Sequence, residues 1–429
     1  MTALVLLGGL LVFLVLGVPV AMALGLSSAI VMVFMTDQSM MSLALKFAHT
    51  MKVYPLLAIP FFILAGTLMS TGGVARRMIN FAIASVGHFR GGLAMAAVLA
   101  CALFAAVSGS SPATVLAIGP IVIAAMIKAG YSKEFSAGVI CNAGTLGILI
   151  PPSIVMVVYA SVTQTSVGKL FMAGVVPGIL LTLMMMLAIY IVTRKMDIEQ
   201  FPKASFREVL RTGKEALWGL MLIVIIMGGI YAGIFTPTEA AVVAVFYSLF
   251  IAVVIYRSIT WRDFIHILVD AAVTSSVIMF IVVFAGIFTW ATSVIGAIDT
   301  AADFIVKISP NALVMIILVN LLLLGLGMVL DAISISYLIM PILIPVLTAF
   351  NIDPLWYGVI FISALAIGQA TPPVGVNLFT AANLIKGNID DVAKEAIPFV
   401  VMDVIVLIFL SLFPILSLYL PVLAGLYTP

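Results

Sequence analysis

The segment Gly147-Ile148-Leu149-Ile150-Pro151-Pro152-Ser153 recurs in outline 221 residues later as Gly368-Gln369-Ala370-Thr371-Pro372-Pro373-Val374. The same offset relates Pro120 to Pro341. A double proline interrupts a helix because proline lacks an N–H donor and clashes with the preceding turn. One offset shared by Gly147 and three prolines predicts two homologous halves, each with a helix broken at the same place.

The composition predicts that these breaks lie within a membrane. Of the 429 residues, 64% are hydrophobic and only 8% are charged, whereas soluble domains carry about a quarter charged residues. Apolar runs approaching the roughly 20 residues needed to cross a bilayer recur along the chain. The first run has no basic leader or cleavage motif, which predicts a retained span. We expect an all-α polytopic protein with the lipid bilayer as its solvent, and the dispersed net charge of +2 predicts no nucleic-acid partner.

Both halves are predicted to follow one order of elements. Two spans separated by proline precede a third span, a connecting arm, a re-entrant hairpin of two short helices, a broken helix and a final span. This order predicts about ten membrane crossings. The predicted boundaries are 1–194 for the first half, with its hairpin at 91–128 and its broken helix at 133–161; 195–213 for a polar, partly helical linker; and 214–429 for the second half, with its hairpin at 311–350, its broken helix at 354–384 and its final span at 396–420.

Charges near the two hairpins predict that the halves are inverted. The arm and exit of the first hairpin are basic, while the second arm carries Asp299 and Asp303. Short cytoplasmic loops are enriched in Lys and Arg, so the first hairpin should open from the cytoplasm and the second from the opposite face. This topology places the linker in the cytoplasm and both termini outside. The basic residues of the first arm and exit are Arg76, Arg77, Arg90, Lys128 and Lys133.

The interrupted helices are candidate binding sites. Unwound backbone at membrane depth is tolerated only where it is buried in protein or lines a cavity. Its free carbonyls can ligate a cation, and helix N-termini can hold an anion. Ser111-Pro112 suits a helix start with a serine cap. Asp331 is the one acidic residue at a hairpin tip, and it is interpreted either as a functional carboxylate or as a helix cap.

The residues at the tips and breaks also favour one coupling ion. They include no His or Lys and a single carboxylate, but many hydroxyl, amide and carbonyl oxygens, which favours sodium over proton coupling. No phosphate-binding loop and no catalytic constellation is found, so we expect neither ATP hydrolysis nor enzyme activity.

Two further features are predicted to be structural. Thr236-Pro237-Thr238-Glu239 is typical of a capping box. Cys101 and Cys141 lie in apolar stretches and are expected to be core residues rather than a disulfide.

Several motifs together resemble those of a known family. The chain is similar to the large membrane subunit, the DctM-like component, of tripartite ATP-independent periplasmic (TRAP) transporters. The resemblance implies an ion-transporter-superfamily elevator in the bacterial inner membrane. Such a subunit imports organic acid anions with sodium, together with a small four-helix subunit and a periplasmic substrate-binding protein. The motifs are Gly17 to Ala21, Pro60 to Gly66, Phe104 to Thr114, Thr236 to Ala241 and Gly368 to Pro373.

The resemblance also implies two sodium sites and a substrate site between the tips. The first sodium site would contain Ser108, Gly109 and Ser110 with Asn142, Gly144 and Thr145. The second would contain Gly327, Asp331 and Ser334 with Gly368, Thr371 and Pro372. The substrate would contact Ser111, Pro112, Pro151, Pro152, Ser336, Pro373 and Asn377. The Ser-Ser-Pro tip resembles C4-dicarboxylate members more than sialic-acid members. A stand-alone anion permease of related fold is the alternative.

Overall fold

The computed structural model describes residues 2–194, 196, 198 and 201–427, and over these residues it is helical without a β-strand. Positions 195, 197, 199 and 200 of the predicted linker, and the terminal positions 1, 428 and 429 of the predicted halves, lie outside the described residues. The first ten helices are α1 (Thr2–Val15), α2 (Val20–Phe34), α3 (Met40–Met51), α4 (Ala58–Thr71), α5 (Val74–Val86), α6 (Gly92–Ser108), α7 (Ser111–Lys128), α8 (Lys133–Leu149), α9 (Ile154–Thr163) and α10 (Val167–Thr193).

The remaining helices follow the linker. They are α11 (Phe206–Tyr231), α12 (Pro237–Phe250), α13 (Trp261–Val294), α14 (Ala297–Ile308), α15 (Ala312–Gly327), α16 (Ala332–Ala349), α17 (Pro354–Gln369), α18 (Val376–Leu384), α19 (Ile389–Leu412) and α20 (Ile415–Leu423). A 3-10 turn at Tyr54–Leu57 precedes α4, and a π-helical turn at Ile251–Ile255 follows α12.

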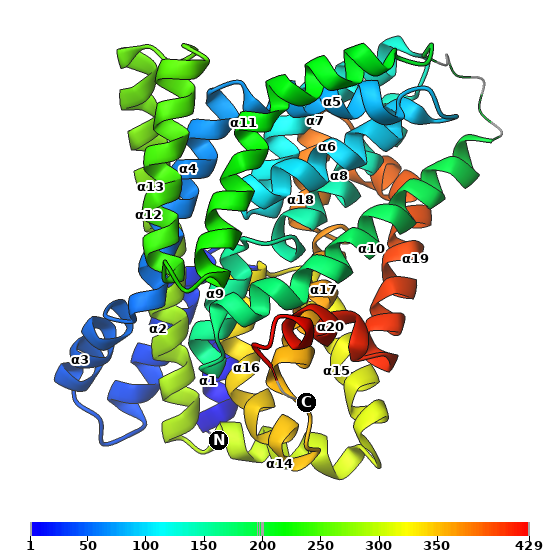
Figure 1. Ribbon diagram of the computed structural model, residues 1–429. Helices are drawn as coiled ribbons and strands as arrows, with labels where there is room; N and C mark the ends of the chain where they lie inside the picture. Colours follow the sequence, from blue (N-terminus) through cyan, green and yellow to red (C-terminus); the bar gives the residue numbers. More distant parts are fainter. Residues whose placement is uncertain (1, 195, 197, 199–200, 428–429) are drawn as a thin grey trace.

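The 221-residue offset recurs in the helix boundaries. Helices α7 and α16 both begin and end 221 residues apart, and α8 and α17 begin at the same separation. Pro177 within α10 and Pro398 within α19 share this offset as well. Figure 1 draws the hairpin α6–α7 in the upper part of the molecule and the hairpin α15–α16 in the lower part, with both chain ends in its lower half. The hairpins therefore lie at opposite ends of the bundle, as two inverted halves require.

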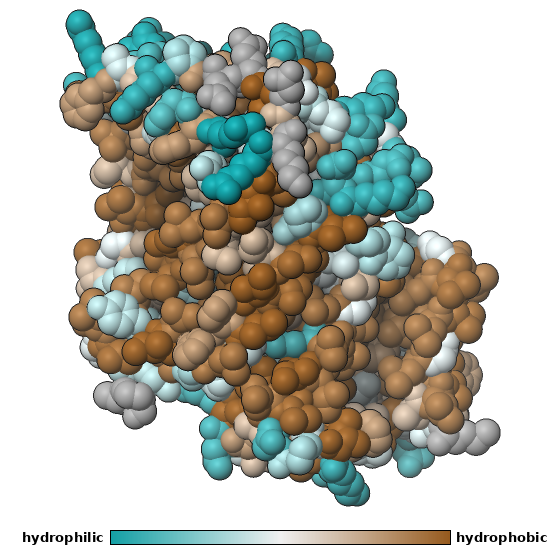
Figure 2. Space-filling model, turned by 90° about the vertical axis from the view of Figure 1, so that its right-hand side faces the viewer, coloured by the Kyte–Doolittle hydropathy of each residue, from teal (hydrophilic) through white to brown (hydrophobic). Residues whose placement is uncertain are grey.

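Among the described residues, eight helices are long and apolar enough to cross a membrane, or nine if the bent pair α8 and α9 counts as one span. This set differs from the ten predicted crossings. It includes α7 and α16, which the sequence assigns to re-entrant hairpins, and it omits α1 and α2, which have 14 and 15 residues. Figure 2 shows an apolar belt around the middle of one face with hydrophilic residues gathered at the two ends. The chain is therefore a multi-pass membrane protein.

Four boundaries differ from the sequence prediction, and two of them have a clear local cause. Helix α11 starts at Phe206, inside the predicted linker, because Ser205 caps it by accepting from the N–H of Glu208 at 3.2 Å. The final span starts at Ile389 instead of Ala396, and it ends at Leu412 because Pro414 interrupts it and starts α20. The amphipathic helix α3 was not predicted, and α13 starts at Trp261, ten residues before the predicted start of that span at Ala271.

Two smaller predictions are confirmed. Thr236 accepts from the N–H of Glu239, whose carboxylate accepts from the N–H of Thr236 at 2.8 Å, so the capping box is present. Cys101 and Cys141 are free and buried.

Candidate binding site at the hairpin tips

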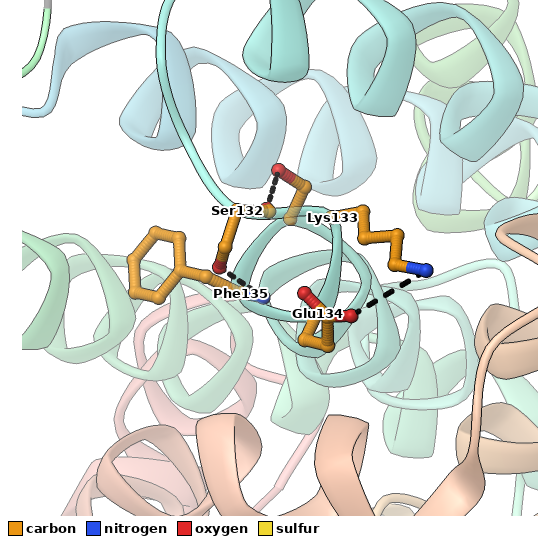
Figure 3. A network of polar contacts seen from close by, with 5 residues as sticks. Ser132, Lys133, Glu134 and Phe135 are labelled. Atoms are coloured by element: carbon orange, nitrogen blue, oxygen red, sulfur yellow. Dashed lines mark hydrogen bonds and ion pairs between the residues drawn. The ribbon is translucent and has the colours of Figure 1, made fainter.

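The broken helix α8 starts at a capped turn (Figure 3). Ser132 accepts from the N–H of Phe135 at 3.1 Å, and its carbonyl accepts from the hydroxyl of Ser136 at 2.8 Å. Lys133 and Glu134 form an ion pair of 3.7 Å. Phe135 is buried and packs edge-on against Phe399 of α19. These contacts fix the direction in which α8 enters the bundle, and hence the position of its break.

The tip of the first hairpin is held by hydroxyl groups. Ser108 ends α6, Gly109 turns the chain with φ +62°, and Ser110 precedes α7. The hydroxyl oxygens of Ser108 and Thr114 lie 2.8 Å apart, and the hydroxyl of Thr114 donates to the carbonyl of Ser110 at 2.9 Å. The predicted cap, Ser111, instead lies inside α7 and donates its hydroxyl to the carbonyl of Gly144, and the N-cap residue Ser110 makes no side-chain hydrogen bond to the first turn, so the predicted serine cap is wrong. The positive end of the α7 dipole therefore has no side-chain acceptor from its N-cap residue.

The first tip lies directly against the first break. The carbonyl of Gly109 accepts from the N–H of Ile154 at 3.1 Å. A Cβ atom on Gly109 would lie 2.9 Å from the carbonyl oxygen of Pro152, and one on Gly147 would lie 2.5 Å from that of Ser110. Real Cβ atoms do not approach other atoms this closely, so only glycine permits this contact between tip and break.

A residue of the second half connects the first tip to α8. The side-chain amide of Asn377, on α18, donates to the hydroxyl of Ser111 at 2.6 Å and to the carbonyl of Cys141 at 3.2 Å. Ser111 in turn donates to the carbonyl of Gly144 at 2.9 Å. Asn377 and Ser111 are both fully buried. Three predicted site residues therefore form one network that joins the two halves.

At the tip of the second hairpin, the carboxylate of Asp331 caps the start of α16. Asp331 accepts from the N–H groups of Ile333 and Ser334, both at 3.0 Å, and from the hydroxyl of Ser334 at 2.5 Å. It is therefore the cap of α16, as one of the two interpretations of this residue requires. A carboxylate offers about four lone-pair sites, so these three bonds leave Asp331 able to accept one more.

The second tip approaches its break through two glycines. A Cβ atom on Gly368 would lie 2.7 Å from the Cα atom of Gly327, and the N–H of Gly375 donates to the carbonyl of Met328 at 2.9 Å. Thr371 donates its hydroxyl to Ile367 at 2.7 Å, and Ser336 donates to Ala332 at 2.7 Å. The structure thus brings Gly327 and Gly368 together, while Thr371 and Ser336 bond within their own segments.

The remaining predicted residues lie in the same region but are not joined to the tips by hydrogen bonds. Asn142 donates to the carbonyl of Gly138 at 2.9 Å, and Thr145 donates to that of Asn142 at 2.6 Å, so both bond within α8. Pro112 opens α7. The four remaining prolines form the two breaks, at Pro151-Pro152 between α8 and α9 and at Pro372-Pro373 between α17 and α18.

Three buried amide oxygens near the breaks have no hydrogen-bond donor within the part of the chain that the structure describes. They are Oδ1 of Asn142, Oδ1 of Asn377 and Oε1 of Gln369. An unpaired buried acceptor costs roughly 1–3 kcal/mol, and a cation can satisfy it. No group of three His, Cys, Asp or Glu residues that could hold a metal occurs in the described part of the chain. Neutral oxygens of this kind suit a hard monovalent cation better than a transition metal.

Some polar groups of this region were not predicted. Ser153 accepts from the N–H of Met156 and donates to the carbonyl of Ile148 at 2.6 Å, so it bridges the first break. Asn320 donates to the hydroxyl of Ser411 at 3.1 Å between α15 and α19. Asp403 is fully buried on α19. The Pro-Pro-Ser sequence could have indicated Ser153, and a carboxylate inside a predicted span could have indicated Asp403, but nothing in the sequence separates Asn320 from lipid-facing positions.

Comparison with known proteins gives a family. Residues 7–416 match the family described as tripartite ATP-independent periplasmic transporter, DctM component. The C4-dicarboxylate TRAP transporter large permease protein DctM of Pseudomonas aeruginosa is 47% identical over 93% of each chain. The isethionate TRAP transporter permease protein DctMQ of Oleidesulfovibrio alaskensis is 37% identical over 97% of this chain and 66% of its own length. The crystal structure of the YdaH transporter of Alcanivorax borkumensis superposes over 98% of this chain with a TM-score of 0.60 at 14% identity, a likeness of fold alone.

Proposed function

This chain belongs to the DctM family of tripartite ATP-independent periplasmic transporters, and from that premise we propose that it is the large permease subunit of a sodium-coupled importer of organic acid anions. C4-dicarboxylates are the favoured substrates, because relatives 42–47% identical over nearly their whole length carry that name. The observation that carries the proposal is the meeting of the uncapped α7 N-terminus, the broken helix α8 and Asn377 at one buried point.

The proposed anion site lies at the first tip. The N-terminus of α7 presents backbone N–H groups and the positive end of the helix dipole, and no side chain of its N-cap residue neutralises them. A substrate carboxylate would accept from these groups and lie between the two tips. The Asp331 carboxylate at the second tip repels an anion and makes the first tip the better position.

The proposed sodium sites use oxygens at the two breaks. At the first break, the backbone carbonyls of the tip and the unpaired amide oxygen of Asn142 supply ligands. At the second, Asp331 has a lone-pair site left and the Gly327–Gly368 contact brings backbone carbonyls close. Binding sodium beside a carboxylate compensates part of the substrate charge. This arrangement supports coupling between ion and substrate binding.

The packing supports an elevator-type movement. Figure 1 draws α2, α4, α12 and α13 as one layer on the left, and both hairpins and both broken helices to their right. Each hairpin packs on both broken helices: α6 and α7 contact α8, α7 contacts α18, α15 contacts α17 and α16 contacts α9. This interlocked block would move as one unit against the static layer, which carries the site from one side to the other.

The partners and location follow from the family. A small four-helix membrane subunit, the Q-type subunit, is proposed as a partner. The relative named DctMQ is longer than this chain, and its name combines M, for the large subunit, with Q, for the small one. A periplasmic binding protein would deliver the substrate, the protein would lie in the bacterial inner membrane, and both termini would face the periplasm.

Reconstituted uptake tests the proposal. Proteoliposomes containing this chain, the small subunit and the binding protein should accumulate a radiolabelled C4-dicarboxylate when a sodium gradient is imposed. Uptake should cease when potassium replaces sodium or when the binding protein is omitted. Equal uptake by this chain alone would instead support the stand-alone permease.

A further inference from the structure

Asp403 is a buried carboxylate that the proposed transport mechanism does not use. It lies on α19, and its side chain is 0% exposed. Neither Oδ1 nor Oδ2 has a hydrogen-bond partner among the described residues. Removing an ionised carboxylate from water without a partner costs at least several kcal/mol. The side chain must therefore be neutralised by a cation.

No side chain of the described neighbouring helices supplies the missing positive charge. Helix α19 packs against α8, α10, α15, α17 and α18. The thiol of Cys141 on α8 is close enough to interact with Asp403 and carries no positive charge. Helices α15 and α18 carry no titratable residue. The others carry Lys133 and Glu134 in the first turn of α8, Lys169 in the first turn and Tyr190 in the last turn of α10, and Tyr357 on α17.

Helix α19 itself offers no counter-ion. Its charged residues other than Asp403 lie in its first two turns: Asp390, Asp391, Lys394 and Glu395. Lys394 pairs with Asp391 at 3.2 Å. It lies nine residues before Asp403, or about 13 Å along the axis at 1.5 Å per residue. Neither of the two ion pairs found within the described ranges involves Asp403.

The repeat shows that this carboxylate is specific to the second half. The offset that relates Pro177 to Pro398 relates Thr182 of α10 to Asp403. Thr182 is also buried, but its hydroxyl donates to the carbonyl of Gly178 at 2.7 Å, within its own helix. A carboxylate without a proton cannot make that bond, because it has no donor. At equivalent positions of the repeat, Thr182 therefore has a hydrogen bond within its own helix, whereas Asp403 has none.

We propose that Asp403 is a proton-binding site, held as the neutral carboxylic acid inside the block of hairpins and broken helices. One carboxylate oxygen takes a proton from a hydronium ion of the solvent: an O–H bond of the hydronium breaks, the carboxyl O–H bond forms, and a water molecule is left. A proton needs no coordination shell, whereas a hard metal cation takes several oxygen ligands, and no polar side chain of the described residues bonds to Asp403. The chain thus carries a bound proton in addition to any sodium at the tips, whether or not the proposed transport activity is correct.

Infrared difference spectroscopy of the purified full chain tests this inference without any transport assay. A protonated carboxylic acid has a C=O stretching band that is separated from the bands of a carboxylate. At neutral pH the wild-type protein should show one such band that Asp403→Asn lacks and that Asp391→Asn, the control on the same helix, retains. The band should be unchanged when potassium replaces sodium.

Two results would overturn the inference. The same bands in the carboxylic-acid C=O region for wild type and Asp403→Asn would mean that Asp403 is ionised. Loss of the band on adding sodium would mean that a metal ion, not a proton, neutralises the side chain. If Asp403→Asn does not fold, Asp403→Thr provides the same comparison, because a threonine there can bond to its own helix as Thr182 does.

Discussion

The two hairpin tips occupy equivalent places in the repeat but end in opposite electrostatic states. Ser110 and Asp331 are 221 residues apart, and each precedes the second helix of its hairpin. Ser110 leaves the start of α7 without a side-chain cap, whereas Asp331 caps α16 with a carboxylate. One tip therefore presents a positive helix end, and the other presents a negative side chain with a lone-pair site left over.

The difference between Ser110 and Asp331 indicates how the same backbone arrangement, repeated twice, can bind both an anion and a cation. Both tips approach their breaks through glycines, so the backbone geometry is shared. The side chain at a single position then leaves the start of α7 positive and places a negative carboxylate at the start of α16. We infer that the helix start of the first tip holds the substrate anion, beside the sodium ligands proposed at the first break, and that the carboxylate of the second tip favours a cation.

Substitution of the glycines at the tip–break contacts is expected to have the largest effect on stability and uptake. In Gly147→Ala and Gly368→Ala the new Cβ atom would lie 2.5 Å from the carbonyl oxygen of Ser110 and 2.7 Å from the Cα atom of Gly327. Because backbone atoms cannot swing aside, each variant should lose about 3 kcal/mol of stability and most uptake. Thermal unfolding in detergent measures the loss. Gly325→Ala, on α15, is the control, since nothing lies within 4 Å of its added carbon.

Making the first tip resemble the second tests the electrostatic difference itself. Ser110→Asp places a carboxylate at the start of α7, where it would compete with the substrate for the same N–H groups. A charge at a partly buried helix terminus is worth up to about 2 kcal/mol, so uptake at subsaturating substrate should fall about 30-fold. Ser110→Asn, which can cap without a charge, should retain more activity. Equal uptake by the wild type and Ser110→Asp would place the anion elsewhere.

Removing the side chain of Asn377, which links the two halves, should have an intermediate effect on stability. Asn377→Ala removes two donated hydrogen bonds and leaves the carbonyl of Cys141 and the hydroxyl of Ser111 without that partner. Leaving buried acceptors unpaired should cost about 1.5 kcal/mol, seen as a lower melting temperature. Asn383→Ala changes an exposed residue of the same helix and should leave the melting temperature unchanged. Equal effects of the two variants would show that Asn377 does not hold the tip.

The sequence predicts the helical framework better than the side-chain partners, for a physical reason. Prolines, glycines and polar tips interrupt helices through the backbone, so the start of α7 and α16 and the breaks after α8 and α17 lie within a few residues of prediction. The break before α20 was missed because a single proline, unlike a double one, is common inside these helices, as Pro120 and Pro177 illustrate.

Side-chain partners depend on which helix face meets which neighbour. Asn377 and Ser111 are 266 residues apart, and nothing local indicates that they form a pair. Asp403 lies in an apolar helix whose buried face is not marked by hydrophobic periodicity, since lipid and core are both apolar. The same ambiguity hides Asn320 and its contact with Ser411.

The smallest expected effect separates the two roles of Asp331. Asparagine caps helices as well as aspartate does, so Asp331→Asn should keep the melting temperature while removing the charge. If the carboxylate also contributes to sodium binding, its loss should cost about 1 kcal/mol, which raises the sodium concentration for half-maximal uptake about fivefold. Asp331→Ala should add a stability loss of about 1 kcal/mol, because the N–H groups of Ile333 and Ser334 lose their acceptor. An unchanged sodium response in Asp331→Asn would leave this residue as a cap only, and the selectivity of the second tip would then rest on its backbone carbonyls.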